Sequence, residues 1–142
     1  MKVEQILQLK GTDIYSVEPD AKIAEAVTIL NEKNIGAVLV REQNGNVVGI
    51  LSERDIVRRL GSRGAEALSM GVSECMTSNI YTCSVDASVD ELMGMMTEKR
   101  IRHLPVTRDG NIVGVVSIGD VVKRKIEEAE QEAAALKEYI AS

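Results

Sequence analysis

One short motif occurs twice in this chain of 142 residues, and its repetition constrains the fold more than any other feature. The first copy, Gly49–Asp55, reads GILSERD, and the second copy, Gly114–Asp120, reads GVVSIGD. The flanking sequence repeats as well: residues 14–59 align with residues 80–124 when one gap is placed at Asn44. A duplicated segment of this length predicts two similar structural units that share one architecture.

Each copy changes its hydrophobic periodicity in the same order. Residues 23–30 and 89–96 carry apolar side chains at helical spacing. Two short apolar runs follow on either side of a Gly-Asn turn, a pattern typical of an antiparallel hairpin. Aliphatic strands and helices must supply the core, because the chain has three Tyr but no Phe or Trp. We therefore predict the α+β class: two β-α-β-β-α repeats packed sheet to sheet with pseudo-two-fold symmetry, plus a long C-terminal helix.

The same patterns predict the domain boundaries. The predicted segments are repeat one at residues 3–60, a connector at 61–71, repeat two at 72–125, and a helical extension at 126–142. Residues 3–9 are expected to lead into repeat one, and residues 72–76 into repeat two. The extension has an apolar seam at heptad-like spacing, formed by Val122, Ile126, Ala129, Ala133, Leu136 and Ile140. Such a helix either lies on its own domain or packs against a second copy.

Composition argues against several functional classes. The net charge of −5 does not suit nucleic acid, which requires many phosphate-neutralising cations. No apolar run approaches the about 20 residues of a membrane span, and the first residues resemble no secretory signal. Two cysteines and one histidine are too few for a metal cluster or a disulfide framework. We therefore expect a cytoplasmic protein with no metal site and no catalytic residues.

The duplicated motif has two interpretations that do not exclude each other. Ser52 and Asp55, like Ser117 and Asp120, have the spacing of a helix N-terminal cap, which explains them without any ligand. The functional interpretation adds that free N–H groups at a helix start suit a phosphate. A carboxylate beside them can accept hydrogen bonds from a ribose diol. The motif pair therefore predicts either structural caps alone or two nucleoside-phosphate pockets.

The double repeat closed by Gly-hydrophobic-x-Ser-x-x-Asp resembles the tandem cystathionine β-synthase (CBS) domain pair, also called a Bateman module. Residues 101–106, Ile-Arg-His-Leu-Pro-Val, match the second-strand motif of that family, and the resemblance covers residues 3–125. It implies a regulatory, energy-sensing module that binds an adenine nucleotide in the cleft between the repeats. Each site would take its Asp from one repeat and its adenine wall from the other.

The resemblance also implies which residues bind the nucleotide. The expected set is Ser52, Arg54, Asp55, Ile80, Tyr81, Ile101, Arg102, His103, Ile14, Tyr15, Ile35, Ser117 and Asp120. Within this set Arg54, Arg102 and His103 are expected to converge on Asp55. The second pocket, around Asp120 with Gly36 and Ala37, is expected to lack cations. We therefore expect unequal sites, in which the Asp55 pocket holds a charged phosphate better.

The leading functional hypothesis is a sensor that signals to an unknown effector protein and forms a homodimer. AMP is the expected ligand, and ADP, ATP, NAD and S-adenosylmethionine remain alternatives because all share the ribose. The alternative hypothesis is a structural oligomerisation module without ligand, in which the Ser and Asp residues are caps only. We expect no enzyme activity, since the chain shows no nucleophile–base pair and its single histidine leaves little general-base chemistry near neutral pH.

Overall fold

The computed structural model describes residues 1–141 and divides the chain into two compact units. One unit holds residues 13–81. The other holds residues 1–12 together with the chain from residue 82 onward. Among the described residues, no helix is both long and apolar enough to cross a membrane.

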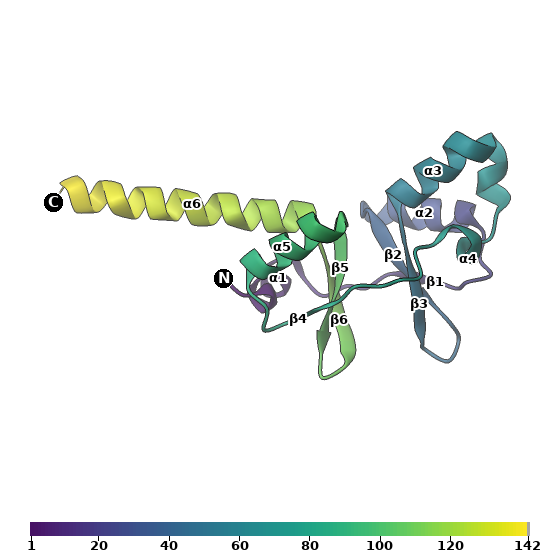
Figure 1. Cartoon of the computed structure of the whole chain (residues 1–142), viewed down its shortest axis with the longest axis horizontal. Coiled ribbons are helices and arrows are strands. Elements are labelled where there is room, and N and C mark those ends of the chain that lie inside the picture. The colour runs from purple at the N-terminus through teal and green to yellow at the C-terminus, as the bar shows by residue number, and fades with distance from the viewer. Residues whose placement is uncertain (142) are drawn as a thin grey trace. The chain divides into compact units, whose positions relative to one another are not determined.

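The unit of residues 13–81 contains the first repeat. Its elements are β1 (Ser16–Val17), α2 (Ile23–Lys33), β2 (Ala37–Arg41), β3 (Val47–Ser52), α3 (Glu53–Arg63), the 3₁₀ helix η1 (Gly64–Ser69) and α4 (Val72–Cys75) (Figure 1). The sheet order is β1-β2-β3, with β1 parallel and β3 antiparallel to the central strand. The predicted β-α-β-β-α order is confirmed. The predicted connector, residues 61–71, is mostly helical, because α3 continues to Arg63 and η1 follows at once.

The other unit contains the second repeat and has the same topology. Its elements are α1 (Val3–Lys10), β4 (Cys83–Ser84), α5 (Val89–Lys99), β5 (His103–Arg108), β6 (Asn111–Ser117) and α6 (Ile118–Ala141). The sheet order is β4-β5-β6, again with one parallel and one antiparallel pair. The long C-terminal helix is confirmed, and Figure 1 shows it extending well beyond the sheet of its own unit. The expected packing of the two sheets against each other stays a prediction.

The short segments that precede the repeats pack on the opposite repeat. Helix α1 precedes the first repeat in sequence, yet its Val3 N–H donates to the Ala87 carbonyl of the second repeat (2.9 Å). Helix α4 precedes the second repeat, yet its Val72 N–H donates to the Ala21 carbonyl of the first repeat (2.8 Å). Residues 3–9 and 72–76 were each expected to lead into the repeat that follows them in sequence. This expectation is wrong for the tertiary structure, because each segment packs on the other repeat. Each lead-in instead caps the turn before the first helix of the other repeat.

Because the lead-in segments are exchanged between the repeats, each motif needs a glycine where the exchanged segment packs on its strand. Gly49 and Gly114 are buried on strands β3 and β6. A Cβ placed on Gly114 would lie 2.7 Å from Leu7 Cδ2 of α1, and a Cβ on Gly49 would overlap the Met76 sulfur just after α4. Each glycine therefore leaves room for a lead-in side chain against its strand.

Aliphatic side chains fill both units, as the composition predicts. In the unit of residues 13–81 the buried cluster is Val17, Ile23, Ala26, Leu30, Val38, Val40, Leu51, Ile56, Val72 and Cys75. In the other unit α1 contributes Val3, Ile6 and Leu7, which are at most 4% exposed. The free thiols Cys75 and Cys83 are buried as small apolar groups.

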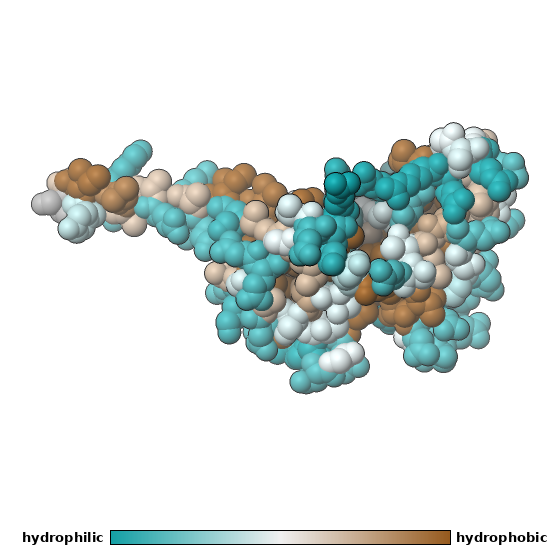
Figure 2. All heavy atoms as spheres, viewed as in Figure 1, coloured by the Kyte–Doolittle hydropathy of each residue, from teal (hydrophilic) through white to brown (hydrophobic). Residues whose placement is uncertain are grey.

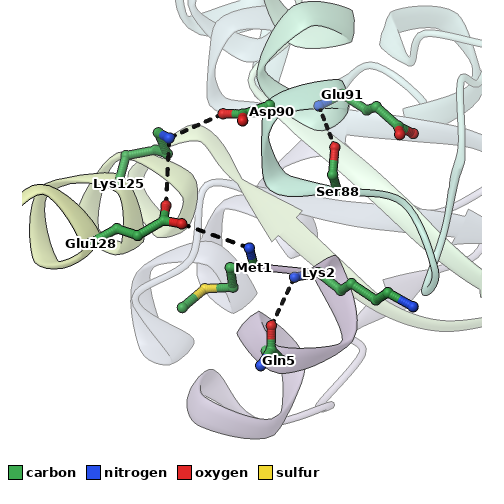
Figure 3. A network of polar contacts seen from close by, with 8 residues as sticks. All are labelled: Met1, Lys2, Gln5, Ser88, Asp90, Glu91, Lys125 and Glu128. Carbon is green, nitrogen blue, oxygen red and sulfur yellow. Dashed lines mark hydrogen bonds and ion pairs between the residues drawn. The ribbon is translucent and has the colours of Figure 1, made fainter. Parts of the chain in front are cut away.

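Polar contacts join α6, α5 and the first residue of the chain (Figure 3). The Lys125 ammonium on α6 lies 3.0 Å from Asp90 of α5 and 3.4 Å from Glu128. The Met1 amino group lies 3.7 Å from the other carboxylate oxygen of Glu128. These contacts tie the base of α6 to α5 and to the chain start before α1.

Candidate functional site

Both copies of the motif form a helix cap of the same design. The Ser52 N–H donates to Asp55 Oδ2 (3.0 Å), and the Asp55 N–H donates back to Ser52 Oγ (3.3 Å). In the second copy the Ser117 N–H donates to Asp120 Oδ2 (2.9 Å), and the Asp120 N–H donates to Ser117 Oγ (3.2 Å). The structural interpretation of the motif is therefore confirmed. One carboxylate oxygen in each copy is held by the cap, and both Asp side chains remain half-buried at the surface.

The residue just before the neighbouring strand, β2 or β5, fixes the start of each helix. The Gly36 carbonyl accepts a hydrogen bond from the Glu53 N–H (2.9 Å), and the Arg102 carbonyl accepts one from the Ile118 N–H (2.8 Å). His103 lies opposite Ser117 in the β5–β6 register. Arg102 and His103 therefore sit beside the Asp120 cap of their own unit. Their predicted convergence with Arg54 and Asp55 joins residues of two units and stays a prediction.

Asp55 borders a polar cavity within its own unit. The cavity has a volume of about 330 Å³ and is lined by Asp55, Arg58, Arg59, Ser62, Cys75, Met76 and Thr77. The Thr77 hydroxyl lies 3.2 Å from Asp55 Oδ1 and 3.4 Å from Oδ2. One arginine of the cavity, Arg59, donates to the Glu74 carbonyl (2.8 Å). A carboxylate, two hydroxyls and two guanidinium groups thus line one recess.

Asp120 has a different neighbour. The Lys10 ammonium donates to Asp120 Oδ2 (2.7 Å) and to the Val115 carbonyl (2.8 Å). Partial burial by itself raises the pKa of Asp120, but the hydrogen bonds from Lys10 and Ser117 outweigh it and bring this pKa below its ordinary value. The expectation that the surroundings of Asp120 lack cations is wrong. The cation comes from α1, which packs on this repeat although it precedes the other one in sequence.

The residues expected to contact adenine are half-buried in both repeats: Ile14, Tyr15, Ile35, Ile80, Tyr81 and Ile101. The Tyr15 carbonyl accepts the Leu39 N–H (3.0 Å), and the Lys33 ammonium lies 5.4 Å from the centroid of the Tyr15 ring. The Tyr81 hydroxyl accepts a hydrogen bond from Asn79 (3.4 Å). Ile35 and Ile101 have matching backbone positions, since each donates its N–H to the helix before it, at Leu30 and Met96. Their contact with a ligand stays a prediction.

Local sequence patterns do not predict the side chains that face the two carboxylates. Lys10 and Thr77 directly follow the exchanged lead-ins, residues 3–9 and 72–76, so they meet the motifs only through tertiary packing. Arg58 and Arg59 of α3 also line the Asp55 cavity. In residues 1–141, no group of three or more His, Cys, Asp or Glu side chains could hold a metal ion.

Comparison with known proteins places this geometry among related folds. A family model described as the CBS domain matches residues 4–62 and 72–127. The chain is similar to a CBS-domain containing protein from Agrobacterium tumefaciens, with 43% sequence identity and a TM-score of 0.85, over 87% of this chain and 92% of that chain.

Two further similar structures contain adenosyl compounds. The CBS domain pair of protein MJ0100, in complex with 5′-methylthioadenosine and S-adenosyl-L-methionine, has 26% identity and a TM-score of 0.79, over 90% of this chain and 98% of that chain. A CBS domain protein from Pyrobaculum aerophilum complexed with AMP has 27% identity and a TM-score of 0.74, over 84% of this chain and 89% of that chain.

Proposed function

This chain belongs to the family of CBS-domain proteins, and from that premise we propose that it is a regulatory module that binds an adenosyl ligand through its Ser-x-x-Asp motif. The observation that carries the proposal is Asp55, a half-buried carboxylate held by its own cap at the edge of a polar cavity. A carboxylate in this position accepts hydrogen bonds from the two hydroxyls of a ribose. The similar proteins found with AMP, or with S-adenosylmethionine and methylthioadenosine, support the same ligand class.

AMP is the ligand we propose to test first. Arg58 and Arg59 line the same cavity as Asp55, and two guanidinium groups suit a phosphate, since arginine matches phosphate geometry with two parallel hydrogen bonds. S-adenosylmethionine shares the ribose but has no phosphate. A preference for AMP over S-adenosylmethionine would therefore indicate that the arginines bind the phosphate. Binding of both ligands would indicate that Asp55 binds the ribose that they share.

A ligand that favours one conformation of the module over another would pass the signal to a partner protein. This regulatory role is proposed in preference to catalysis. The polar groups around Asp55 are a carboxylate, hydroxyls and guanidinium groups, and no pair among them is arranged as a nucleophile with its base.

Isothermal titration of the purified chain with AMP and with S-adenosylmethionine tests the proposal. The decisive variant is Asp55→Asn, which keeps an oxygen for the Ser52 N–H while removing the negative charge. We expect it to weaken binding at least tenfold. The matched control Asp20→Asn changes an exposed Asp of the same unit outside the motif and should bind like the unaltered chain.

The second candidate function is a structural oligomerisation module, which is favoured by the fact that both motifs already form complete helix caps. Absence of binding heat for both ligands, from a chain that unfolds cooperatively, would reject the sensor and leave this candidate. Equal binding by Asp55→Asn and the unaltered chain would reject the role of the motif while keeping the ligand.

A further inference from the structure

The two motif aspartates share one cap design but face different chemical groups. Asp55 meets a neutral hydroxyl, that of Thr77, whereas Asp120 meets the ammonium group of Lys10. We propose that Lys10 closes the Asp120 motif to a ribose, so that each chain binds one adenosyl ligand, through Asp55. This inference rests on the proposed function and specifies which of its two motifs is active.

The difference has a structural origin in the exchanged lead-ins. Leu7 and Met76 occupy equivalent places, each against the glycine of a motif. Helix α1 continues past Leu7 to Lys10, which lies on the same helix face one turn later. Helix α4 ends at Cys75, and the chain then runs extended, with Thr77 and Ile50 exchanging both backbone hydrogen bonds at 2.9 Å. An ammonium group therefore reaches one carboxylate, and a threonine hydroxyl reaches the other.

The contacts of Lys10 make it a stronger competitor for the carboxylate than Thr77. Its ammonium binds two acceptors of the same unit, Asp120 Oδ2 and the Val115 carbonyl, and its side chain is 32% exposed. A ribose at Asp120 would have to replace a charge-assisted hydrogen bond. A ribose at Asp55 exchanges one neutral hydroxyl for another. The ion pair also neutralises the charge on Asp120 that would strengthen its hydrogen bonds to a diol.

The test is the number of AMP molecules bound per chain, measured by titration at high protein concentration. For the unaltered chain we expect one AMP, with affinity reduced at least tenfold in Asp55→Asn and changed less than twofold in Asp120→Asn. Lys10→Met keeps the aliphatic stem and removes the ammonium, and we expect it to bind two AMP per chain. Lys2→Met removes the same charge from the residue before α1 and should still bind one.

The outcomes separate this inference from the function on which it rests. Two AMP bound by the unaltered chain, or equal losses in the two Asp variants, would overturn the closure of Asp120 and leave nucleotide binding intact. Weaker binding in Lys10→Met would also overturn it, because Lys10 would then be a phosphate ligand. Absence of binding of both AMP and S-adenosylmethionine, by the unaltered chain and by Lys10→Met, would refute the proposed function itself. The Asp120→Asn result needs no Lys10 variant, so it decides the matter even if Lys10→Met folds poorly.

A second inference comes independently from α6. The seam from Val122 to Ile140 is exposed: Val122 is 44%, Ile126 54%, Leu136 59% and Ile140 74% exposed. Figure 2 shows apolar patches on the surface of this helix where it extends beyond its unit. Ile126, Ala133 and Ile140 occupy a positions of a heptad, and Val122, Ala129 and Leu136 occupy d positions. From the charges beside this seam we infer that α6 pairs in parallel with α6 of a second copy of this chain.

The flanking charges distinguish the two possible orientations. In a parallel pair each g residue faces the e residue five positions later on the partner. This places Lys125 against Glu130 and Glu132 against Lys137, so both contacts are attractive. In an antiparallel pair with the whole seam aligned, e residues face e and g residues face g. Glu130 would then face its own copy, as would Glu132, and Lys123 would face Lys137, so all of these contacts are repulsive.

Lys125 already contacts Asp90 and Glu128 at the base of the helix, so Glu132 and Lys137 carry the test. Sedimentation equilibrium should show a monomer–dimer equilibrium for the unaltered chain. Lys137→Glu should weaken the dimer about tenfold, because two attractive contacts become repulsive. The swapped variant Glu132→Lys with Lys137→Glu should restore it. Glu138→Lys, on the helix face away from the seam, is the control and should leave the dimer unchanged.

Disulfide formation reports the orientation directly. In a parallel pair Ala133→Cys places two cysteines opposite each other, and oxidation should cross-link the chains. In the antiparallel pair residue 133 faces residue 129 of the partner, so the same variant would not cross-link. The native thiols of Cys75 and Cys83 are buried, so they should not form cross-links between chains. A monomer at every concentration, or a dimer that Lys137→Glu strengthens, would overturn the inference.

Discussion

Replacing Gly114 by alanine tests the exchange of the lead-in helices. An alanine Cβ at this position would lie 2.7 Å from Leu7 Cδ2 and 3.3 Å from Cδ1, closer than side-chain atoms normally approach. Leu7 is 4% exposed and is held by α1, whose Val3 and Ile6 are fully buried, so it has little room to move. Overpacking of this kind costs about 1–3 kcal/mol. We expect the free energy of unfolding to fall by that amount and the midpoint of thermal unfolding to fall by several degrees.

Gly94 provides the matched control. It lies inside α5, and a Cβ placed there meets no atom within 4 Å. Gly94→Ala should therefore stabilise the chain by about 0.8–1.0 kcal/mol through helix propensity alone. The same chemical change thus has opposite expected signs at two sites of one unit. Urea titration followed by circular dichroism measures both variants.

A double-mutant cycle assigns the cost of Gly114→Ala to Leu7. Leu7→Ala alone should cost about 2–5 kcal/mol by leaving a cavity. In the double variant the methyl group added at position 114 enters the space that Leu7 vacates, so the combined loss should be smaller than the sum by about 1 kcal/mol or more. Strict additivity, or a Gly114→Ala variant as stable as Gly94→Ala, would show that α1 does not pack on β6 as described.

Three further predictions concern single residues. Arg100 ends α5 in the left-handed conformation (φ 55°), as Asn34 ends α2 (φ 53°). Because asparagine tolerates this conformation better than arginine, Arg100→Asn should raise the free energy of unfolding, measured by urea titration, by about 0.5–1 kcal/mol. A loss of stability would contradict this explanation. The pKa of Asp120 is lowered from 3.8, so its contribution to stability is present above that pH and is lost as the pH falls through the lower folded value. Acid unfolding of Lys10→Met should therefore depend less steeply on pH in this range, and an unchanged acid limb would count against the ion pair. Burial raises the pKa of Cys83 to about 11 and also raises the pKa of Cys75. A thiol reagent at pH 8 should therefore modify both cysteines only at the rate at which the chain unfolds. Rapid modification of the native chain would contradict their burial.

The sequence by itself determined the architecture of each repeat. The duplication, the switch from helical to strand periodicity and the Gly-Asn turn are local signals, and local signals specify β-α-β-β-α twice. The Ser-x-x-Asp spacing likewise predicts the caps, because both partners lie within one helical turn. The family resemblance followed from the same residues and is confirmed.

Only the tertiary structure decided which groups face the two aspartates. Periodicity reports which face of an element is buried, but not which neighbour buries it. Residues 3–9 and 72–76 look like equivalent lead-ins, and their exchange between repeats leaves no trace in local spacing. The motif glycines give the one local indication, since a glycine inside a strand indicates that another group packs closely against it. The sequence of the strand does not identify the side chain that does so. Leu7, Lys10, Met76 and Thr77 reach their places through contacts between distant segments, and these contacts make two nearly identical motifs chemically different.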